Sequence, residues 1–310
     1  AGMMTGRTAV RAPLMRDTLH LVTAADFVGL RPVFVPLLAR RFRGSPFFRN
    51  LAGVDQDAVA EVARVHLEAG PKTAAELGRL LAEQWPGRDP LSLAMVVRPR
   101  LALVQIPPRG VWGSGGLPTW ALAEDWLGRR VGTDARPDRL VRRYLAALGP
   151  ATIADIQNWS GLSGIRTVVE RLRDELLVFH DERGRALYDV PEAPRPDPGT
   201  PAPPRYLPEY DNLLLGHHDR TRVMAVEHKT PLFPGSGGVL GSVLLDGRFA
   251  GGWQIVRGGR SDPSSVSLKV DLLAPASATD RRALATEGEQ LLAFAAAGAK
   301  VRDVVIGGGG

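Results

Sequence analysis

The stretch that most constrains the fold is 150–190, PATIADIQNWSGLSGIRTVVERLRDELLVFHDERGRALYDV. Thr152 is placed to cap a short helix, Gly161 suits a tight turn, and Ser163 is placed to cap a second helix near 163–174. That second helix has apolar residues at helical spacing, namely Ile165, Val168, Val169 and Leu172. Two short strands around the turn ERGR follow. With the preceding helix at 137–149, this order predicts a winged helix-turn-helix, used either for DNA or only for protein contacts.

A second copy of the pattern precedes the first. The segment 54–70 reads as an amphipathic helix, and 72–85 reads as a helix with a capping box between Thr73 and Glu76. We expect the segment 89–100 to be a recognition helix that ends or kinks at Pro99, and 101–113 to be the wing. The two winged-helix units are therefore placed at 51–125 and 126–190.

The start of the chain resembles half of such a unit. The segment TAVRAPLMRDTLHLV (8–22) predicts a strand, a turn and a strand, but no helix-turn-helix comes before it. Thr23 and Asp26 then open a helix that ends in basic residues. We interpret 1–50 as the remnant of a first winged-helix unit plus a basic helix. Alternatively, Met3 or Met4 is a true start and the two strands pair elsewhere.

The last part of the chain has a different character. A Pro-rich linker is expected over 191–205, stiff and extended. Within 206–310, Asp246-Gly247 predicts a hairpin turn, and a third strand, a helix and a closing strand follow it. The expected fold class is α+β, with tandem winged helix-turn-helix units followed by a small antiparallel β-rich domain.

Charge points to nucleic acid. The formal net charge is +6, with a pI near 10.1, and arginine supplies most of the excess. Arginine suits phosphate because its planar fork donates to two oxygens at once. No acidic residue occurs over 27–54 or over 90–123. The DNA-binding residues predicted from these stretches and from the helix at 163–174 are Arg40, Arg41, Arg43, Arg98, Arg100, Arg109, Arg166 and Arg171. An arginine-rich composition is also what a GC-rich genome produces.

Other classes of function are less well supported. No apolar run approaches the roughly 20 residues of a membrane helix, so we expect no membrane partner. Cysteine is absent, which excludes disulfides and thiolate metal sites and fits a cytoplasmic protein. The stretch 206–220 carries His217, His218 and Asp219, and His228 follows. Adjacent side chains on an extended segment diverge, so we expect no metal there and no cofactor. The sequence has no G-x-S-x-G, which argues against a serine hydrolase.

Four motifs together resemble a known family. They are RAPLMRDTLHLVTAADF, LVQIPPRGVWG, LPEYDNLLLGHHDRTRV and LLDGRFAGGW. They resemble the winged helix DNA-binding family that includes the AlkZ and YcaQ DNA glycosylases. The resemblance implies a basic cleft around double-stranded DNA and hydrolysis of the N-glycosidic bond of alkylated or crosslinked bases. It implies a framework beside the cleft made by Tyr210, Asn212, His217 and Arg220, although a hydrogen-bonded turn that holds two domains together explains Tyr210, Asp211 and Asn212 equally well.

The sequence departs from that family at its catalytic motif. The family has a Gln-apolar-Gln or Gln-apolar-Asp motif near its N-terminus, whereas the first glutamine here is Gln56. Either about 50 N-terminal residues lie outside this chain, or the protein lacks glycosylase activity, or another carboxylate took over. Asp17, His20 and Asp211 are the candidate catalytic residues. A DNA-binding protein without enzymatic activity and a scaffold that binds protein remain alternatives, and we expect a monomer.

Overall fold

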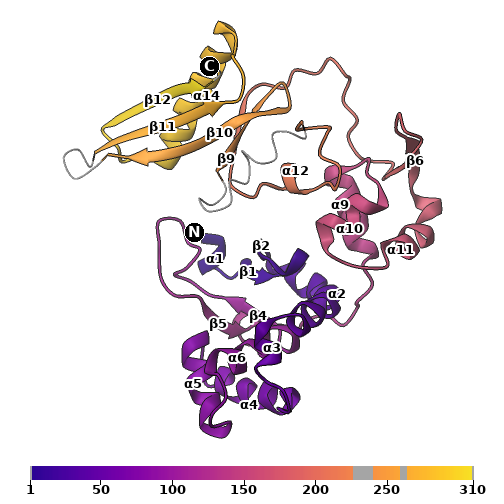
Figure 1. Cartoon of the computed structure of the whole chain (residues 1–310), viewed down its shortest axis with the longest axis vertical. Helices are drawn as coiled ribbons and strands as arrows, with labels where there is room; N and C mark the ends of the chain where they lie inside the picture. The colour runs from indigo at the N-terminus through magenta and orange to yellow at the C-terminus, as the bar shows by residue number, and fades with distance from the viewer. Residues whose placement is uncertain (1, 226–239, 259–263, 309–310) are drawn as a thin grey trace. The chain divides into compact units, whose positions relative to one another are not determined.

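The computed structural model describes residues 2–225, 240–258 and 264–308 (Figure 1). The chain divides into unit 1, Ala1–Pro191, and unit 2, Glu192–Gly310. Both units combine helices with sheets whose strands are mainly antiparallel, which confirms the α+β class. None of the helices in the described ranges is both long and apolar enough to span a membrane.

The main sheet of unit 1 brings the N-terminal hairpin and the second block of the sequence together. Its five strands are β1 (Ala9–Pro13), β2 (Leu19–Thr23), β3 (Lys72–Thr73), β4 (Leu103–Gln105) and β5 (Thr119–Leu122), in the order β2-β1-β4-β5-β3. The hairpin predicted over 8–22 is confirmed, and β1 also pairs with β4 through Arg11 and Gln105. The hairpin therefore shares a sheet with β4, which lies in the segment 101–113 predicted as the second wing, whereas β5, the partner of β4, lies beyond that segment.

Helices pack around this sheet. They are α1 (Gly2–Thr5), α2 (Ala24–Arg43), α3 (Pro46–Arg49), α4 (Gln56–Glu68), α5 (Ala74–Gln84), α6 (Pro90–Met95), α7 (Val97–Arg100) and α8 (Ala123–Leu127). The predicted capping box of Thr73 and Glu76 is present, and Thr23 caps α2. The expected recognition helix is two helices, α6 and α7, with Pro99 in the last turn before the chain becomes extended at Leu101. Leu77, Leu81, Leu93 and Val97 form part of one buried core with α4.

The rest of unit 1 follows the predicted order of elements. Three helices, α9 (Asp138–Leu148), α10 (Ile153–Ser160) and α11 (Ile165–Arg171), precede the hairpin of β6 (Leu177–His180) and β7 (Ala186–Asp189). Thr152 caps α10 as predicted, and Gly161, predicted as a tight turn, ends this helix in the left-handed conformation. The predicted cap at Ser163 is wrong. The N-cap of α11 is the left-handed Gly164, which makes no side-chain cap bond, and the Ser163 hydroxyl accepts a hydrogen bond from Arg40 instead.

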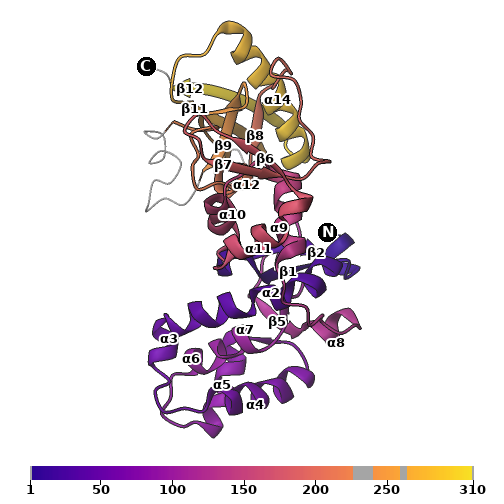
Figure 2. The same cartoon turned by 90° about the vertical axis from the view of Figure 1, so that its right-hand side faces the viewer.

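Unit 2 is built on one sheet with a helix packed against it (Figures 1 and 2). Its strands are β8 (Arg205–Leu207), β9 (Gly241–Leu245), β10 (Arg248–Arg257), β11 (Ser265–Leu272) and β12 (Val301–Gly308), in the order β12-β11-β10-β9-β8. Asp246 and Gly247 are both left-handed and form the predicted hairpin turn. Among the described strands of this sheet, only β11 and β12 pair in parallel, and α14 (Ala278–Ala295) connects those two strands. The segment 191–204 contains neither helix nor strand.

Candidate nucleic-acid interface

The tip of the β1–β2 hairpin is held in a strained conformation. It is a 3-10 turn, η1 (Met15–Asp17), in which Arg16 and Asp17 have φ values of 57° and 61°. For residues other than glycine, this left-handed backbone conformation costs roughly 1–2 kcal/mol per residue. The Asp17 carboxylate pairs with Arg98 of α7 at 2.7 Å. The Arg16 guanidinium donates to the carbonyl of Trp159 in α10. Contacts from two helices therefore fix this tip.

Asp17 lies among three arginines. Burial raises the pKa of Asp17 above its ordinary value, although the positive charges of Arg98, Arg41 and Arg31 act in the opposite direction. Its side chain is 21% exposed and lines a small cavity of about 80 Å³ together with Arg41 and Arg98. Because the Asp17 carboxylate is partly exposed to this cavity, it is able to interact with a positive charge that develops on a molecule bound there. Because Arg98 already holds one of its oxygens, it is less suited to act as a free general base.

His20 and Asp211, the other two catalytic candidates, have different settings. Burial lowers the pKa of His20, which favours a neutral imidazole. Its Nδ1 lies 2.8 Å from the carbonyl of Thr18, so Nδ1 donates and Nε2 is left as an acceptor. Asp211 belongs to unit 2, where its carboxylate caps the short helix α12 (Asn212–Leu215) by accepting from the amide of Leu213 at 2.8 Å. Asp17 and His20 thus share one hairpin, whereas Asp211 performs a local structural role.

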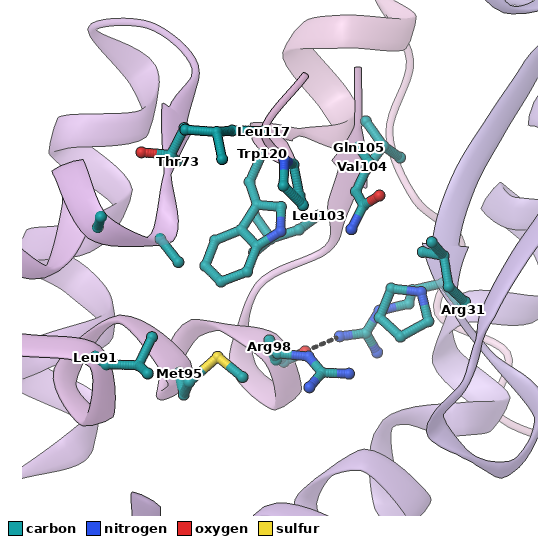
Figure 3. A pocket seen from close by; sticks show the side chains of 15 residues that line it. Arg31, Thr73, Leu91, Met95, Arg98, Leu103, Val104, Gln105, Leu117 and Trp120 are labelled. Carbon is teal, nitrogen blue, oxygen red and sulfur yellow. Dashed lines mark hydrogen bonds between the residues drawn. The ribbon is translucent and has the colours of Figure 1, made fainter. Parts of the chain in front are cut away.

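A larger cavity of about 490 Å³ lies beside Arg98 in unit 1. Its walls come from the β1–β2 hairpin, from β4 and β5, and from the helices α5, α6 and α7. Figure 3 shows Trp120 and Met95 facing the same space, with Gln105 and Arg31 on its other side. A cavity of this size with a mostly apolar lining and a few polar groups suits a small molecule or group.

Arg31 is the buried cation of this region, and sequence reasoning missed it. It lies in α2, is only 3% exposed, and donates through Nη2 to the carbonyls of Arg98 and Leu101, both at 3.0 Å. Nη1 has no hydrogen-bond partner in the part of the chain that the structure describes. Burial lowers the pKa of Arg31 to about 10, so it remains charged at neutral pH. The one available signal was a basic residue between Leu30 and Val33 on an otherwise apolar stretch.

The arginines predicted from the acid-free stretch 90–123 meet acids from elsewhere in the chain. Arg98 pairs with Asp17, and Arg100 donates to Asp57 at 2.7 Å and to Gln56 at 3.0 Å. Arg109 donates to the carbonyl of Gly116 at 2.8 Å and is otherwise exposed. The absence of acids along the sequence therefore does not make every one of these cations available to a ligand.

Among the arginines of α2 and α11, some are held by other groups of the protein and others are exposed without an ion pair to a described residue. Arg40 donates to the carbonyl of Gly161 at 2.8 Å, and Arg171 makes a two-pronged pair with Asp138 at 2.8 and 2.6 Å. Arg43 and Arg166 are exposed, and neither makes an ion pair with any described residue. Arg41 is exposed beside Asp17. Arg41, Arg43 and Arg166 are thus exposed and make no ion pair with a described residue, and Arg109 is hydrogen-bonded only within its own loop.

The stretch that resembled a cleft framework forms a turn within unit 2. Tyr210 is left-handed and 64% exposed, and Asn212 begins α12. His217 is buried, whereas its neighbour His218 is exposed, so the two side chains diverge as predicted. Burial lowers the pKa of Arg220, whose carbonyl accepts from the amides of Val223 and Met224. His228 lies outside the described residues. Within those residues, no three acidic or histidine side chains are grouped so as to hold a metal ion.

Comparisons with known proteins agree with this picture. A family model described as DNA glycosylase AlkZ-like matches residues 1–294. A Streptomyces sahachiroi protein, "Interstrand DNA cross-link repair glycosylase", is 30% identical over 162 residues, which is 48% of this chain and 42% of that protein. The match therefore spans less than half of that relative. The solved structure of Streptomyces sahachiroi DNA glycosylase AlkZ superposes with a TM-score of 0.70 at 22% identity, covering 99% of this chain and 83% of the other. The chain belongs to the AlkZ-like DNA glycosylase family.

Proposed function

We propose that this protein binds double-stranded DNA and acts in repair as a glycosylase of alkylated or crosslinked bases. The observation that carries the proposal is the family match over residues 1–294, which spans both units. One relative is named as an interstrand DNA cross-link repair glycosylase, and this name supports crosslinked bases as the lesion in our proposal. We also propose that the protein is a monomer and that it is cytoplasmic, and the absence of cysteine fits only the second of these.

The arrangement that we propose for DNA binding is a set of tandem winged-helix units. In 51–125, helices α4 to α7 precede the strands β4 and β5, and in 126–190, helices α9 to α11 precede the hairpin β6–β7. The remnant over 1–50 supplies a hairpin and the basic helix α2. The remaining two segments of the proposed domain division are the linker 191–205 and the α+β domain 206–310. Helices α6–α7 and α11 are the proposed recognition elements.

The proposed phosphate contacts come first from the exposed arginines Arg41, Arg43, Arg109 and Arg166. Of the remaining predicted cations, Arg98, Arg100 and Arg171 pair with acids, and Arg40 donates to the carbonyl of Gly161, far from it in sequence. They would contribute to the positive field of the surface and keep its elements in place. In unit 2, we propose that the framework of Tyr210, Asn212, His217 and Arg220 shapes the wall of the cleft.

The reaction breaks the bond between the base nitrogen and C1′ of the sugar. The base leaves with the electron pair, and a water molecule adds to the oxocarbenium-like carbon and loses its proton. Asp17 is the carboxylate of this chain best placed to stabilise that positive charge, because it is partly exposed beside a small cavity. No Gln-apolar-Gln or Gln-apolar-Asp motif occurs within 1–310. This supports the alternative that these residues bind DNA without catalysing base release.

The test uses a duplex with one N7-alkylguanine and measures binding and base release separately. We expect the 310-residue chain to bind the duplex but to release little base. A version that includes whatever residues the gene encodes before Ala1 is tested beside it. Release by that version alone would place the catalytic groups before Ala1, and release by neither would favour the binding protein. Robust release by the 310-residue chain, lost in Asp17→Asn but not in Asp211→Asn, would make Asp17 catalytic. A chain that does not bind DNA would contradict the proposal.

A further inference from the structure

The loop between β4 and β5 is long and has a defined shape. It covers 106–118, IPPRGVWGSGGLP, whereas the strands on either side pair directly through Gln105 and Trp120. Two successive turns close within it, from the amide of Val111 to the carbonyl of Pro108 at 3.1 Å and from the amide of Ser114 to the carbonyl of Val111 at 3.0 Å. The bond from Arg109 to the carbonyl of Gly116 joins its two sides. The loop is thus largely organised before any ligand binds.

Two large apolar side chains of this loop are more than two-thirds exposed. Trp112 is 70% exposed and Leu117 is 72% exposed. A tryptophan so exposed is unusual, because this side chain is highly buried on average. Exposed aromatic rings on an organised loop suit stacking on the flat face of a nucleobase.

The base of the loop carries two cations in close proximity. Burial lowers the pKa of Arg11, and the charge of Arg109 lowers it further, which indicates that the two guanidinium groups are near each other. Neither makes an ion pair with an acid among the residues that the structure describes. Gly110 has φ +88°, and a Cβ atom there would lie 2.3 Å from Cδ of Arg11. Glycine at this position therefore lets the loop lie directly against Arg11, and two uncompensated guanidinium groups favour an anion such as phosphate.

We propose that the loop 106–118 probes DNA for unpaired bases, with Arg11 and Arg109 on the phosphates and Trp112 stacked on a base that has lost its partner. The proposal rests on the proposed function, since it assigns the step that locates a lesion. Unpairing and unstacking a base costs less where the base is damaged or mismatched, so a probe of this kind would slow the protein where the duplex is weakened. Leu117 supplies a second apolar contact on the same loop.

The experiment compares two duplexes that differ only by one extra unpaired adenine. We expect the wild-type chain to bind the bulged duplex more tightly than the paired one. Trp112→Ala should lower the affinity for the bulged duplex by about tenfold or more and that for the paired duplex much less, since stacking on one base is worth about that much. Trp112→Phe should restore most of the loss. Phe294→Ala removes an aromatic side chain of α14 that is 75% exposed and serves as the matched control.

A second readout separates stacking from general weakening. Arg109→Ala should weaken binding to both duplexes similarly and make the dependence on salt shallower. If Trp112→Ala binds the bulged duplex as tightly as the wild type does, or if Phe294→Ala loses as much affinity, the loop is not the probe. If the wild-type chain binds neither duplex, the proposed function itself fails and this proposal fails with it. Circular dichroism of each variant confirms that it is folded.

Discussion

At the scale of single residues, partners that are distant in sequence decide what each arginine does. The stretch 90–123 contains no acid, yet Arg98 meets Asp17 and Arg100 meets Asp57 in the folded chain. Each of these acids lies more than 40 positions away from its arginine. Arg109 and Arg166 keep their side chains exposed. A count of local charge therefore does not indicate which of these cations are held by acids from elsewhere in the chain.

The Arg98–Asp17 pair should be important for stability. We expect Arg98→Ala to lower the free energy of unfolding by about 1–2 kcal/mol, because it leaves the half-buried Asp17 without its charged donor. Arg109→Ala removes an exposed side chain and should change it by less than about 0.5 kcal/mol. Urea unfolding of both variants measures the difference. Equal effects would show that the pair does not hold the tip.

Local signals at this scale were readable from the sequence, and tertiary ones were not. The caps at Thr23, Thr73 and Thr152 depend on residues within three positions, and all three form as predicted. Arg31 depends on carbonyls of α7 and the following residue, which are about 70 positions away. No local pattern contains that information, so its burial could not be predicted.

At the scale of elements, Asp26 of α2 forms ion pairs with Arg143 and Arg139 of α9. Arg143 donates to both oxygens of Asp26, at 3.1 Å for the longer bond. The hydrogen bond from Arg143 is the main cause that holds the pKa of Asp26 below its usual value. A carboxylate with a lowered pKa stabilises the folded state above its unfolded pKa of about 3.9, and this contribution disappears as pH falls through the folded value.

The lowered pKa of Asp26 predicts how the stability of the Asp26→Asn variant depends on pH. At pH 7 the variant should be less stable than the wild type by about 1 kcal/mol. The difference should shrink as the pH falls below about 4, because protonated Asp26 then resembles asparagine. Chemical unfolding at a series of pH values measures this. Glu61→Gln, on the exposed face of α4, is the control and should show no such trend. A difference that is constant with pH would contradict the assignment.

The helix α11 offers a second comparison within one element. Arg166 is exposed and makes no ion pair with a described residue, whereas Arg171 is held by Asp138. If α11 contacts DNA, Arg166→Ala should reduce the slope of log affinity against log salt by about 0.9, the value for one phosphate. Arg171→Ala should act mainly on stability. An unchanged slope for Arg166→Ala would exclude this residue from the interface.

The elements themselves were largely predictable, but their pairing was not. Alternation of apolar residues and turn signals located the hairpin over 8–22 and the hairpin at Asp246-Gly247, and both are present. The bridge between Arg11 and Gln105, which merges the first hairpin into the sheet of the second block, joins residues that are far apart in sequence. Such a pairing depends on how the intervening helices pack, and sequence periodicity does not report that.

At the scale of the whole molecule, composition indicated the division of the chain. The Pro-rich segment expected as a linker over 191–205 begins where unit 1 ends, and it contains no helix or strand before β8. Within unit 1, by contrast, the hairpin of the first block and the strands of the second share one sheet. A sheet that continues between two repeats makes them one compact body, although their sequences read as separate copies.

The most direct test of the account is the salt dependence of binding to a duplex of random sequence. Four exposed arginines that neutralise phosphates should give a log-log slope of about −3.6 or steeper between 50 and 200 mM salt. Simultaneous replacement of Arg41, Arg43, Arg109 and Arg166 by alanine should remove most of that slope while the chain stays folded. A slope near zero for the wild-type chain, or no measurable affinity at the lowest salt concentration, would contradict the claim that this protein binds DNA through its arginines.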